Sequence, residues 1–188
     1  MGGSYQTTDY QHRVASGTIP AIQIGDWILH DSQAILEYLE EQYSEPAMWS
    51  KDVRCRAEQR ALTHYHDTKL EPAVRCLVPL VKMADSRERD LQIDSALDQL
   101  FDRVFRLNKM VNPSPWLTGQ AMSPADFCFP VTLQMGLDLL THFGRKLALP
   151  SPLENWLDHA SKFSLIEEEI SRVRGAIALW LGHDGELN

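Results

Sequence analysis

The stretch that decides the fold, Gly17–Leu39, reads GTIPAIQIGDWILHDSQAILEYL. Two runs rich in apolar and β-branched residues, Ile19–Ile24 and Trp27–Leu29, are separated by Gly25-Asp26. This pattern is typical of an antiparallel hairpin. Apolar residues then recur at helical spacing up to Leu39, which indicates an amphipathic helix. The sequence therefore predicts a hairpin over residues 19–29 and a helix over residues 32–43, capped by Asp31 or Ser32.

The remaining sequence is mostly helical in character. Residues 1–16 are polar and aperiodic, with a short strand expected around Tyr5–Thr8. Pro and Ser in the segment 44–49 indicate a linker between a domain of residues 1–44 and an all-helical domain of residues 50–188. Pro72 and Pro79 predict a kink or a break in the first helix of that domain. The expected helices cover about 51–83, 87–111, 123–142, 152–162 and 164–181.

Composition narrows the class of partner. The formal net charge of −8 argues against nucleic acid as a binding partner. No apolar run approaches the ~20 residues that a membrane-spanning helix needs. The cysteines Cys55, Cys76 and Cys128 show no paired spacing. We expect reduced thiols, buried as small apolar side chains, in a cytoplasmic protein. No metal site is expected, because His64 and His66 are two residues apart and point to different faces of a helix.

Two short motifs at the ends of the hairpin point to a ligand. If the bond before Pro20 is cis, the chain turns sharply and exposes the backbone N–H and C=O of Ile19, which could pair with an extended peptide. Ser32 begins a helix, where free N–H groups favour a carboxylate, and Asp31 could accept from an ammonium group. The alternatives are a trans proline that merely starts a strand and an Asp31-Ser32 pair that is only a helix cap.

These residues carry a resemblance to a known family. The pattern G-x-I-P-x-I from Gly17, the Gly25-Asp26 turn and L-x-D-S-x-A-I-x-x-Y-L from Leu29 are similar to the G-x-V-P-x-L, D-G and L-x-E-S-x-A-I-x-x-Y-L of cytosolic glutathione transferases. The resemblance implies a cis bond before Pro20, with Ile19 bonding the cysteinyl backbone of glutathione. It also implies that Asp31 and Ser32 bind the γ-glutamyl end. The chain departs from the family in having Asp31 for Glu or Gln and in reversing the Asp-Gly turn.

Two further matches lie in the helical part. Residues 116–127 resemble the L-x-G and S-x-A-D helix start of the family, in which Ser123 and Asp126 form a capping box of structural value. Residues 64–72 resemble the first helix of the family's second domain. That helix lines the pocket for the electrophile, so the resemblance makes Tyr65 and His66 candidates for this pocket.

The resemblance implies a protein that is mostly α with a small α/β part: a partial thioredoxin-like glutathione-binding domain followed by an all-helical domain. Glutathione would be a co-substrate, conjugated to a small hydrophobic electrophile, and a homodimer is the family's expectation. The family's catalytic Tyr, Ser or Cys lies in a first strand-helix unit with no counterpart in the sixteen residues before Gly17, so the catalytic residue is unknown. Two alternatives stay open: a catalytically inactive binding or interaction module, and a helical scaffold without a ligand.

Overall fold

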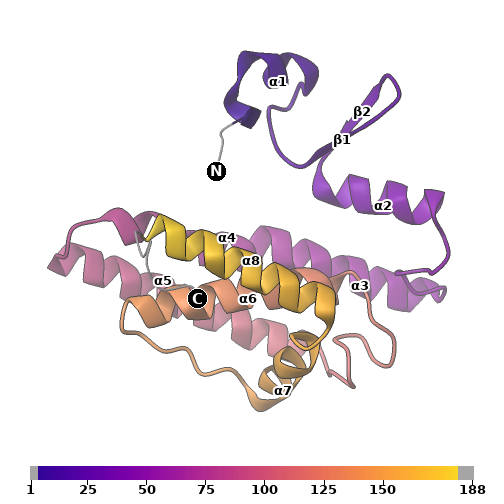
Figure 1. Ribbon diagram of the computed structural model, residues 1–188. Helices are drawn as coiled ribbons and strands as arrows, with labels where there is room; N and C mark the ends of the chain where they lie inside the picture. Colours follow the sequence, from indigo (N-terminus) through magenta and orange to yellow (C-terminus); the bar gives the residue numbers. More distant parts are fainter. Residues whose placement is uncertain (1–3, 182–188) are drawn as a thin grey trace. The chain divides into compact units, whose positions relative to one another are not determined.

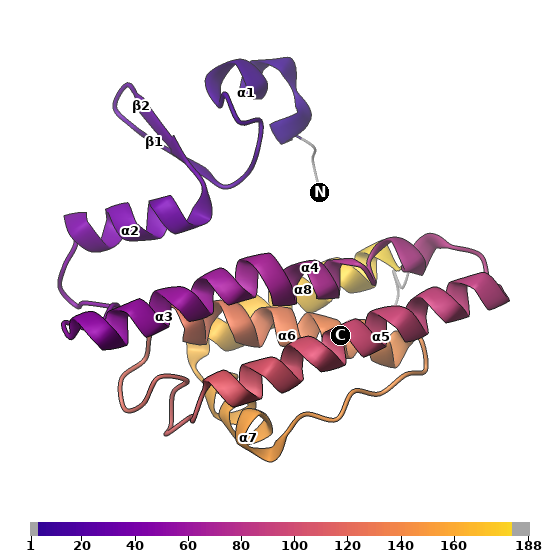
Figure 2. The same ribbon diagram turned by 180° about the vertical axis from the view of Figure 1, so that it is seen from behind.

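The structure of the chain, a computed structural model, describes residues 4–181 (Figures 1 and 2). The chain divides into two compact units, Met1–Trp49 and Ser50–Asn188. The expected domains of residues 1–44 and 50–188 include the first three and the last seven residues, which lie outside the described range.

The first unit is built around a two-stranded hairpin. It contains the 3-10 turn η1 (Ser4–Gln6), α1 (Thr8–Arg13), β1 (Ala21–Ile24), β2 (Trp27–His30) and α2 (Ser32–Gln42). β1 and β2 pair antiparallel, from Ala21 opposite His30 to Ile24 opposite Trp27. Gly25 has a φ of +59° at the first turn position, which a type II′ hairpin turn requires. This geometry accounts for the order Gly25-Asp26.

The prediction of a short strand around Tyr5–Thr8 is wrong. This segment enters η1 and α1 instead. Thr7 is the reason, because its Oγ1 accepts a hydrogen bond of 3.3 Å from the backbone N–H of Tyr10 and so caps α1. A Thr side chain that satisfies a free N–H of the first turn stabilises a helix start over an extended chain.

The second unit is entirely helical within the described residues. Its helices lie side by side, and α6 contacts α3, α4, α7 and α8 (Figures 1 and 2). Large apolar side chains from η2, α5, α6, α7, α8 and the loops between them fill the core, with Leu70, Phe129 and Trp156 almost fully buried. The elements are α3 (Val53–Tyr65), the π-helical segment η2 (His66–Leu70), α4 (Glu71–Arg75), the 3-10 turn η3 (Pro79–Lys82), α5 (Arg87–Met110), α6 (Ala125–His142), α7 (Ser151–Ala160) and α8 (Ser164–Trp180).

The break expected in the helix over 51–83 is confirmed. α3 passes into η2, a π-helical segment, before α4 begins with Pro72 in its first turn. Pro79 then opens η3. Pro72 thus closely follows the π-helical segment, and Pro79 stands in the first turn of η3.

The start of α6 differs in detail from the expected capping box. The Asp126 carboxylate accepts from the backbone N–H of Ser123 at 2.9 Å, which is the reciprocal half of the box. The Ser123 hydroxyl, however, also donates to this carboxylate at 2.9 Å instead of accepting from the helix backbone. The helix itself runs from Ala125, two residues later than expected.

The expectation that all three cysteines are buried is wrong for Cys76, which is exposed at the C-terminal end of α4. Cys55 and Cys128 are partly buried, and all three are free thiols. Among residues 4–181, no helix has the length and apolar character needed to cross a bilayer.

Candidate glutathione site

The hairpin register gathers the four candidate residues at one end of the ribbon. Ala21 lies opposite His30 in the last rung of the ladder. Ile19 and Pro20 directly precede Ala21, and Asp31 and Ser32 directly follow His30. The two chain segments that carry them therefore leave the ladder side by side. The Ile19–Pro20 peptide bond is cis, and the Ile19 side chain is 62% exposed.

Asp31 links β2 to α2 and holds a backbone conformation that is rare for residues other than glycine. Its φ is +81° and its ψ is 123°. Its Oδ1 accepts hydrogen bonds from the backbone N–H groups of Gln33 at 2.9 Å and Ala34 at 3.1 Å, so the carboxylate caps α2. Backbone outliers of this kind cost about 1–3 kcal/mol and cluster at binding sites. Within residues 4–181, Oδ2 of Asp31 has no hydrogen-bond partner.

Ser32 is the first residue of α2 and is exposed. An N–H at this position has no acceptor inside its own helix, and in the described part of the chain the Ser32 hydroxyl makes no hydrogen bond. Two donors of Ser32 thus stand next to an unpaired carboxylate oxygen of Asp31. A donor pair at a helix N-terminus suits a carboxylate, and the Asp31 oxygen suits an ammonium group. Together they suit the zwitterionic end of an amino acid.

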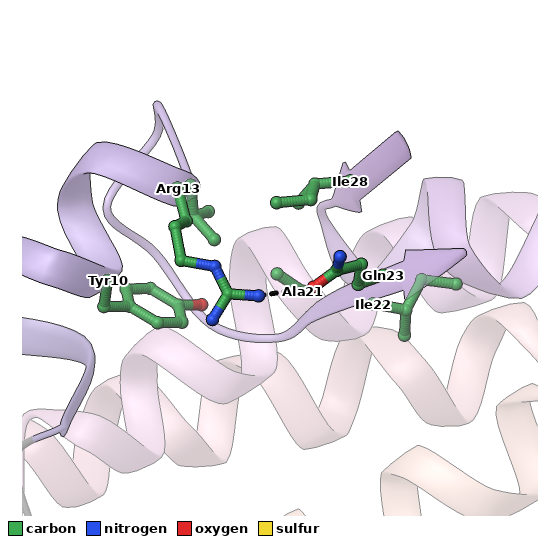
Figure 3. A pocket seen from close by; sticks show the side chains of 7 residues that line it. Tyr10, Arg13, Ala21, Ile22, Gln23 and Ile28 are labelled. Atoms are coloured by element: carbon green, nitrogen blue, oxygen red, sulfur yellow. Dashed lines mark hydrogen bonds between the residues drawn. The ribbon is translucent and has the colours of Figure 1, made fainter. Parts of the chain in front are cut away.

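A hollow between α1 and the hairpin is too small for such a ligand. The Arg13 guanidinium from α1 reaches across to the Gln23 side chain on β1 and hydrogen-bonds with it (Figure 3). The hollow encloses about 120 Å³, well below the ~300 Å³ of a small-molecule pocket. The Tyr10 hydroxyl, which also lines it, donates to the Thr18 carbonyl at 2.8 Å. These contacts hold α1 against the hairpin.

In the helical unit, Tyr65 and His66 stand where α3 meets η2. The Tyr65 hydroxyl donates to the Arg103 carbonyl at 2.8 Å, and burial raises the pKa of Tyr65. Their assignment to an electrophile pocket stays a prediction.

His66 is buried and uses both ring nitrogens. Nδ1 lies 2.7 Å from Oδ1 of Asp67, and Nε2 lies 2.7 Å from the Thr132 hydroxyl on α6. The ring edge also meets Phe129. The contact with Thr132 joins residues 66 positions apart in the sequence. No local sequence pattern predicts it. In the described range, no three His, Cys, Asp or Glu side chains are grouped so that they could hold a metal ion.

Known proteins resemble this chain in sequence. Residues 2–47 match the family model described as "Glutathione S-transferase, N-terminal domain". Human glutathione S-transferase theta-2 is 27% identical over 131 residues, which cover 66% of this chain and 53% of the relative. The maleylacetoacetate isomerase of Pseudomonas aeruginosa is 39% identical over 62 residues, 32% of this chain and 29% of the relative. The chain spans about half the length of the human relative.

Solved structures share the fold over most of the chain. Human glutathione-S-transferase T1-1 in its apo form superposes with a TM-score of 0.74 at 22% identity, covering 91% of this chain and 74% of that one. The theta class glutathione S-transferase from the citrus canker pathogen Xanthomonas axonopodis pv. citri, with glutathione bound, gives 0.69 at 20% identity, covering 89% and 79%. These likenesses place a thioredoxin-like part before a helical domain.

Residues 2–47 therefore match the N-terminal domain of the glutathione S-transferase family, and the chain as a whole has the fold of cytosolic glutathione transferases.

Proposed function

We propose that this chain binds glutathione at the open end of the hairpin, with the γ-glutamyl group at Asp31 and Ser32. The observation that carries the proposal is the pairing of two free Ser32 donors with the unpaired Oδ2 of Asp31, because a γ-glutamyl group presents both a carboxylate and an ammonium. The bound glutathione named for the Xanthomonas relative supports this choice of ligand.

The other end of the tripeptide would run along the segment before β1. The exposed backbone of Ile19, turned by the bond to Pro20, would pair with the cysteinyl residue of glutathione as an added strand does. This placement uses the register, which brings Ile19 and Ser32 to the same end of the hairpin.

We further propose that the protein conjugates the glutathione thiolate to small hydrophobic electrophiles in the cytoplasm, as a homodimer. Activation of the thiol needs a hydrogen-bond donor that lowers its pKa, and no residue of this chain is assigned that role. Tyr65 and His66 of the helical unit are the candidates for the electrophile pocket. The second candidate is an inactive binding or interaction module, which the Asp31 cap of α2 favours, since that cap serves the fold without any ligand.

Thermal unfolding with and without millimolar glutathione tests the binding. A ligand of the native state raises the midpoint by mass action. We expect the rise in the wild type and its loss in Ser32→Ala. The matched control is Ser164→Ala, which alters the equivalent exposed first position of α8 and should keep the rise.

An unchanged midpoint in the wild type would contradict the assigned site. A rise that Ser32→Ala preserves would place glutathione elsewhere. If binding is found, turnover with an aromatic electrophile separates the two candidates: the conjugating enzyme forms a thioether, and the inactive module forms none.

A further inference from the structure

The helical unit holds a row of three hydrogen-bonded side chains. Oδ1 of Asp67 lies 2.7 Å from Nδ1 of His66, and Nε2 of His66 lies 2.7 Å from the hydroxyl of Thr132. Asp67 and His66 belong to η2, and Thr132 belongs to α6. A carboxylate, an imidazole and a hydroxyl in this order form the arrangement in which a base activates a nucleophile and a third group orients the base.

The direction of each hydrogen bond follows from the chemistry of the three groups. An ionised carboxylate only accepts, so the proton between Asp67 and His66 belongs to Nδ1. A neutral imidazole with its proton on Nδ1 has a lone pair on Nε2, which makes Nε2 the acceptor for the Thr132 hydroxyl. The hydroxyl proton of Thr132 therefore already points at the base that would remove it.

The hydroxyl of Thr132 has a different partner from those of other helical threonines in this unit. Thr68 and Thr141 each donate the hydroxyl to the backbone carbonyl four residues earlier, which is the usual bond of a threonine inside a helix. Within residues 4–181, the hydroxyl of Thr132 bonds only to His66. The lone pairs of this oxygen are thus left for another atom.

The surroundings of the row strengthen its hydrogen bonds. The His66 side chain is only 8% exposed, and the edge of its ring packs against Phe129 with centroids 5.1 Å apart. Because water is largely excluded from the imidazole, its hydrogen bonds are stronger than they would be in water. Thr132 is partly exposed, so a small substrate can reach the hydroxyl. The π-helical form of η2 is also of a kind that is frequent at functional sites.

We propose that Thr132 is the nucleophile of a second activity, the transfer of small acyl groups from activated esters to water. His66 is the general base, and Asp67 is the positioning residue that holds its tautomer. In the first half, Oγ1 of Thr132 forms a bond to the acyl carbon and its proton passes to Nε2 of His66. The bond between the acyl carbon and the ester oxygen breaks, and Nε2 gives its proton to the departing oxygen.

Water completes the reaction in the second half. It attacks the acyl carbon of the ester on Thr132, and one of its protons passes to Nε2 of His66. The bond between the acyl carbon and Oγ1 then breaks, the proton moves from Nε2 to Oγ1, and the carboxylic acid leaves. No step needs glutathione or the hairpin end at Asp31 and Ser32, so this activity and the proposed function can fail separately.

The test uses the full chain and p-nitrophenyl acetate without glutathione. We expect a stoichiometric burst of p-nitrophenolate followed by slower turnover. Peptide mapping of acid-quenched wild-type protein should find the acetyl group on Thr132. The competing acceptor is the exposed thiol of Cys76. Absence of a burst, or an acetyl group found on Cys76 and not on Thr132, overturns the proposal.

Threonine variants on α6 provide the matched control. Thr132→Val keeps the shape of the side chain and removes the hydroxyl, so it should abolish the burst, whereas Thr132→Ser should retain it. Thr141→Val changes an exposed threonine of the same helix, whose hydroxyl bonds to the Leu137 carbonyl, and should leave the burst unchanged. A burst that survives in Thr132→Val contradicts the assignment. The mapping of the wild type decides the question even if this variant does not fold.

Asp67→Asn tests the positioning role. The asparagine amide donates to Nδ1, which moves the ring proton of His66 to Nε2 and removes the acceptor of the Thr132 hydroxyl. We expect the burst rate to fall at least about a hundredfold, and the nitrogen-15 chemical shifts of His66 to report the exchanged tautomer. An unchanged burst rate in a variant with the exchanged tautomer refutes the role of Asp67. A wild type in which Nε2 carries the proton refutes the mechanism.

Discussion

The indole nitrogen of Trp156 donates a hydrogen bond of 2.9 Å to Oδ1 of Asp126, across thirty residues of chain. Both side chains are almost completely buried. The same oxygen accepts from the backbone N–H of Leu117 at 2.9 Å, while Oδ2 accepts from Ser123. One carboxylate therefore joins the first turn of α6 to α7 and to the loop before α6.

Replacing Asp126 should destabilise the helical unit strongly. Asp126→Ala leaves buried donors of Leu117, Ser123 and Trp156 without an acceptor, and each unsatisfied group costs about 1–3 kcal/mol before relaxation. We expect a loss of about 3–5 kcal/mol in the free energy of unfolding, measured by urea denaturation. Asp158→Ala on α7, which removes an exposed ion pair with Lys162 just after the helix, should cost less than about 1 kcal/mol. A small effect of Asp126→Ala would mean that the network is dispensable.

Two helical glycines should respond to alanine in opposite directions. A Cβ at Gly136 of α6 would lie 3.0 Å from Cγ2 of Val74 and 3.2 Å from Cδ2 of Leu100. This overpacking outweighs the helix propensity of alanine, so Gly136→Ala should destabilise the protein by about 1–2 kcal/mol. At Gly175 of α8, no atom of residues 4–181 outside the neighbouring helix backbone lies within 4 Å of the new Cβ, and Gly175→Ala should stabilise by about 0.5–1 kcal/mol. Midpoints of chemical denaturation give both signs, and equal effects would contradict the packing argument.

The Asp31→Asn variant distinguishes the role of Asp31 as the cap of α2 from its proposed role in binding glutathione. Asparagine caps helices as well as aspartate does and tolerates positive φ, so the free energy of unfolding should change by less than about 0.5 kcal/mol. The amide lacks the negative charge that would hold an ammonium group, so calorimetric titration should show glutathione binding about tenfold weaker. Asp31→Ala should weaken both properties. Unchanged affinity in Asp31→Asn would restrict Asp31 to its structural role.

The three thiols should differ in reactivity. Burial raises the pKa of Cys128 above its ordinary value of 9.0, so little of the reactive thiolate forms in the folded protein. Cys76 is exposed and should react quickly with an aromatic disulfide reagent at pH 8, while Cys128 should react only after unfolding. Equal rates for Cys76→Ser and Cys128→Ser variants in the native state would contradict this order.

The same shift links Cys128 to stability at alkaline pH. A folded-state pKa above that of the unfolded chain means that the unfolded chain loses its proton first as the pH rises. The contribution to stability is therefore complete below the ordinary thiol pKa and falls as the pH rises above it. Urea denaturation at pH 7 and pH 10 should show a smaller fall in stability for Cys128→Ala than for the wild type.

Local chemistry predicted much of the first unit. The backbone conformation here is set by residues that act only on their immediate neighbours: Gly25, Pro20 and the Asp31-Ser32 pair. The hairpin turn and the start of the following helix can therefore be predicted from the sequence. The helix that begins after Thr7 could not be predicted, because one capping residue in a polar stretch produces no periodic pattern of apolar residues. Contacts between residues far apart in the sequence could not be predicted. The contact of His66 with Thr132 and that of Asp126 with Trp156 form only when the helices pack together.

The π-helical segment His66–Leu70 bears on how this chain is compared with its relatives. A π-helical turn accommodates one residue more than an α-helical turn of the same height. Residues after it are therefore displaced by about one position relative to an uninterrupted helix. A gapless alignment through this region against a regular helix would pair wrong residues on one side of His66. A one-residue gap at His66–Leu70 keeps buried positions such as Leu62 and Val74 in phase with their structural counterparts.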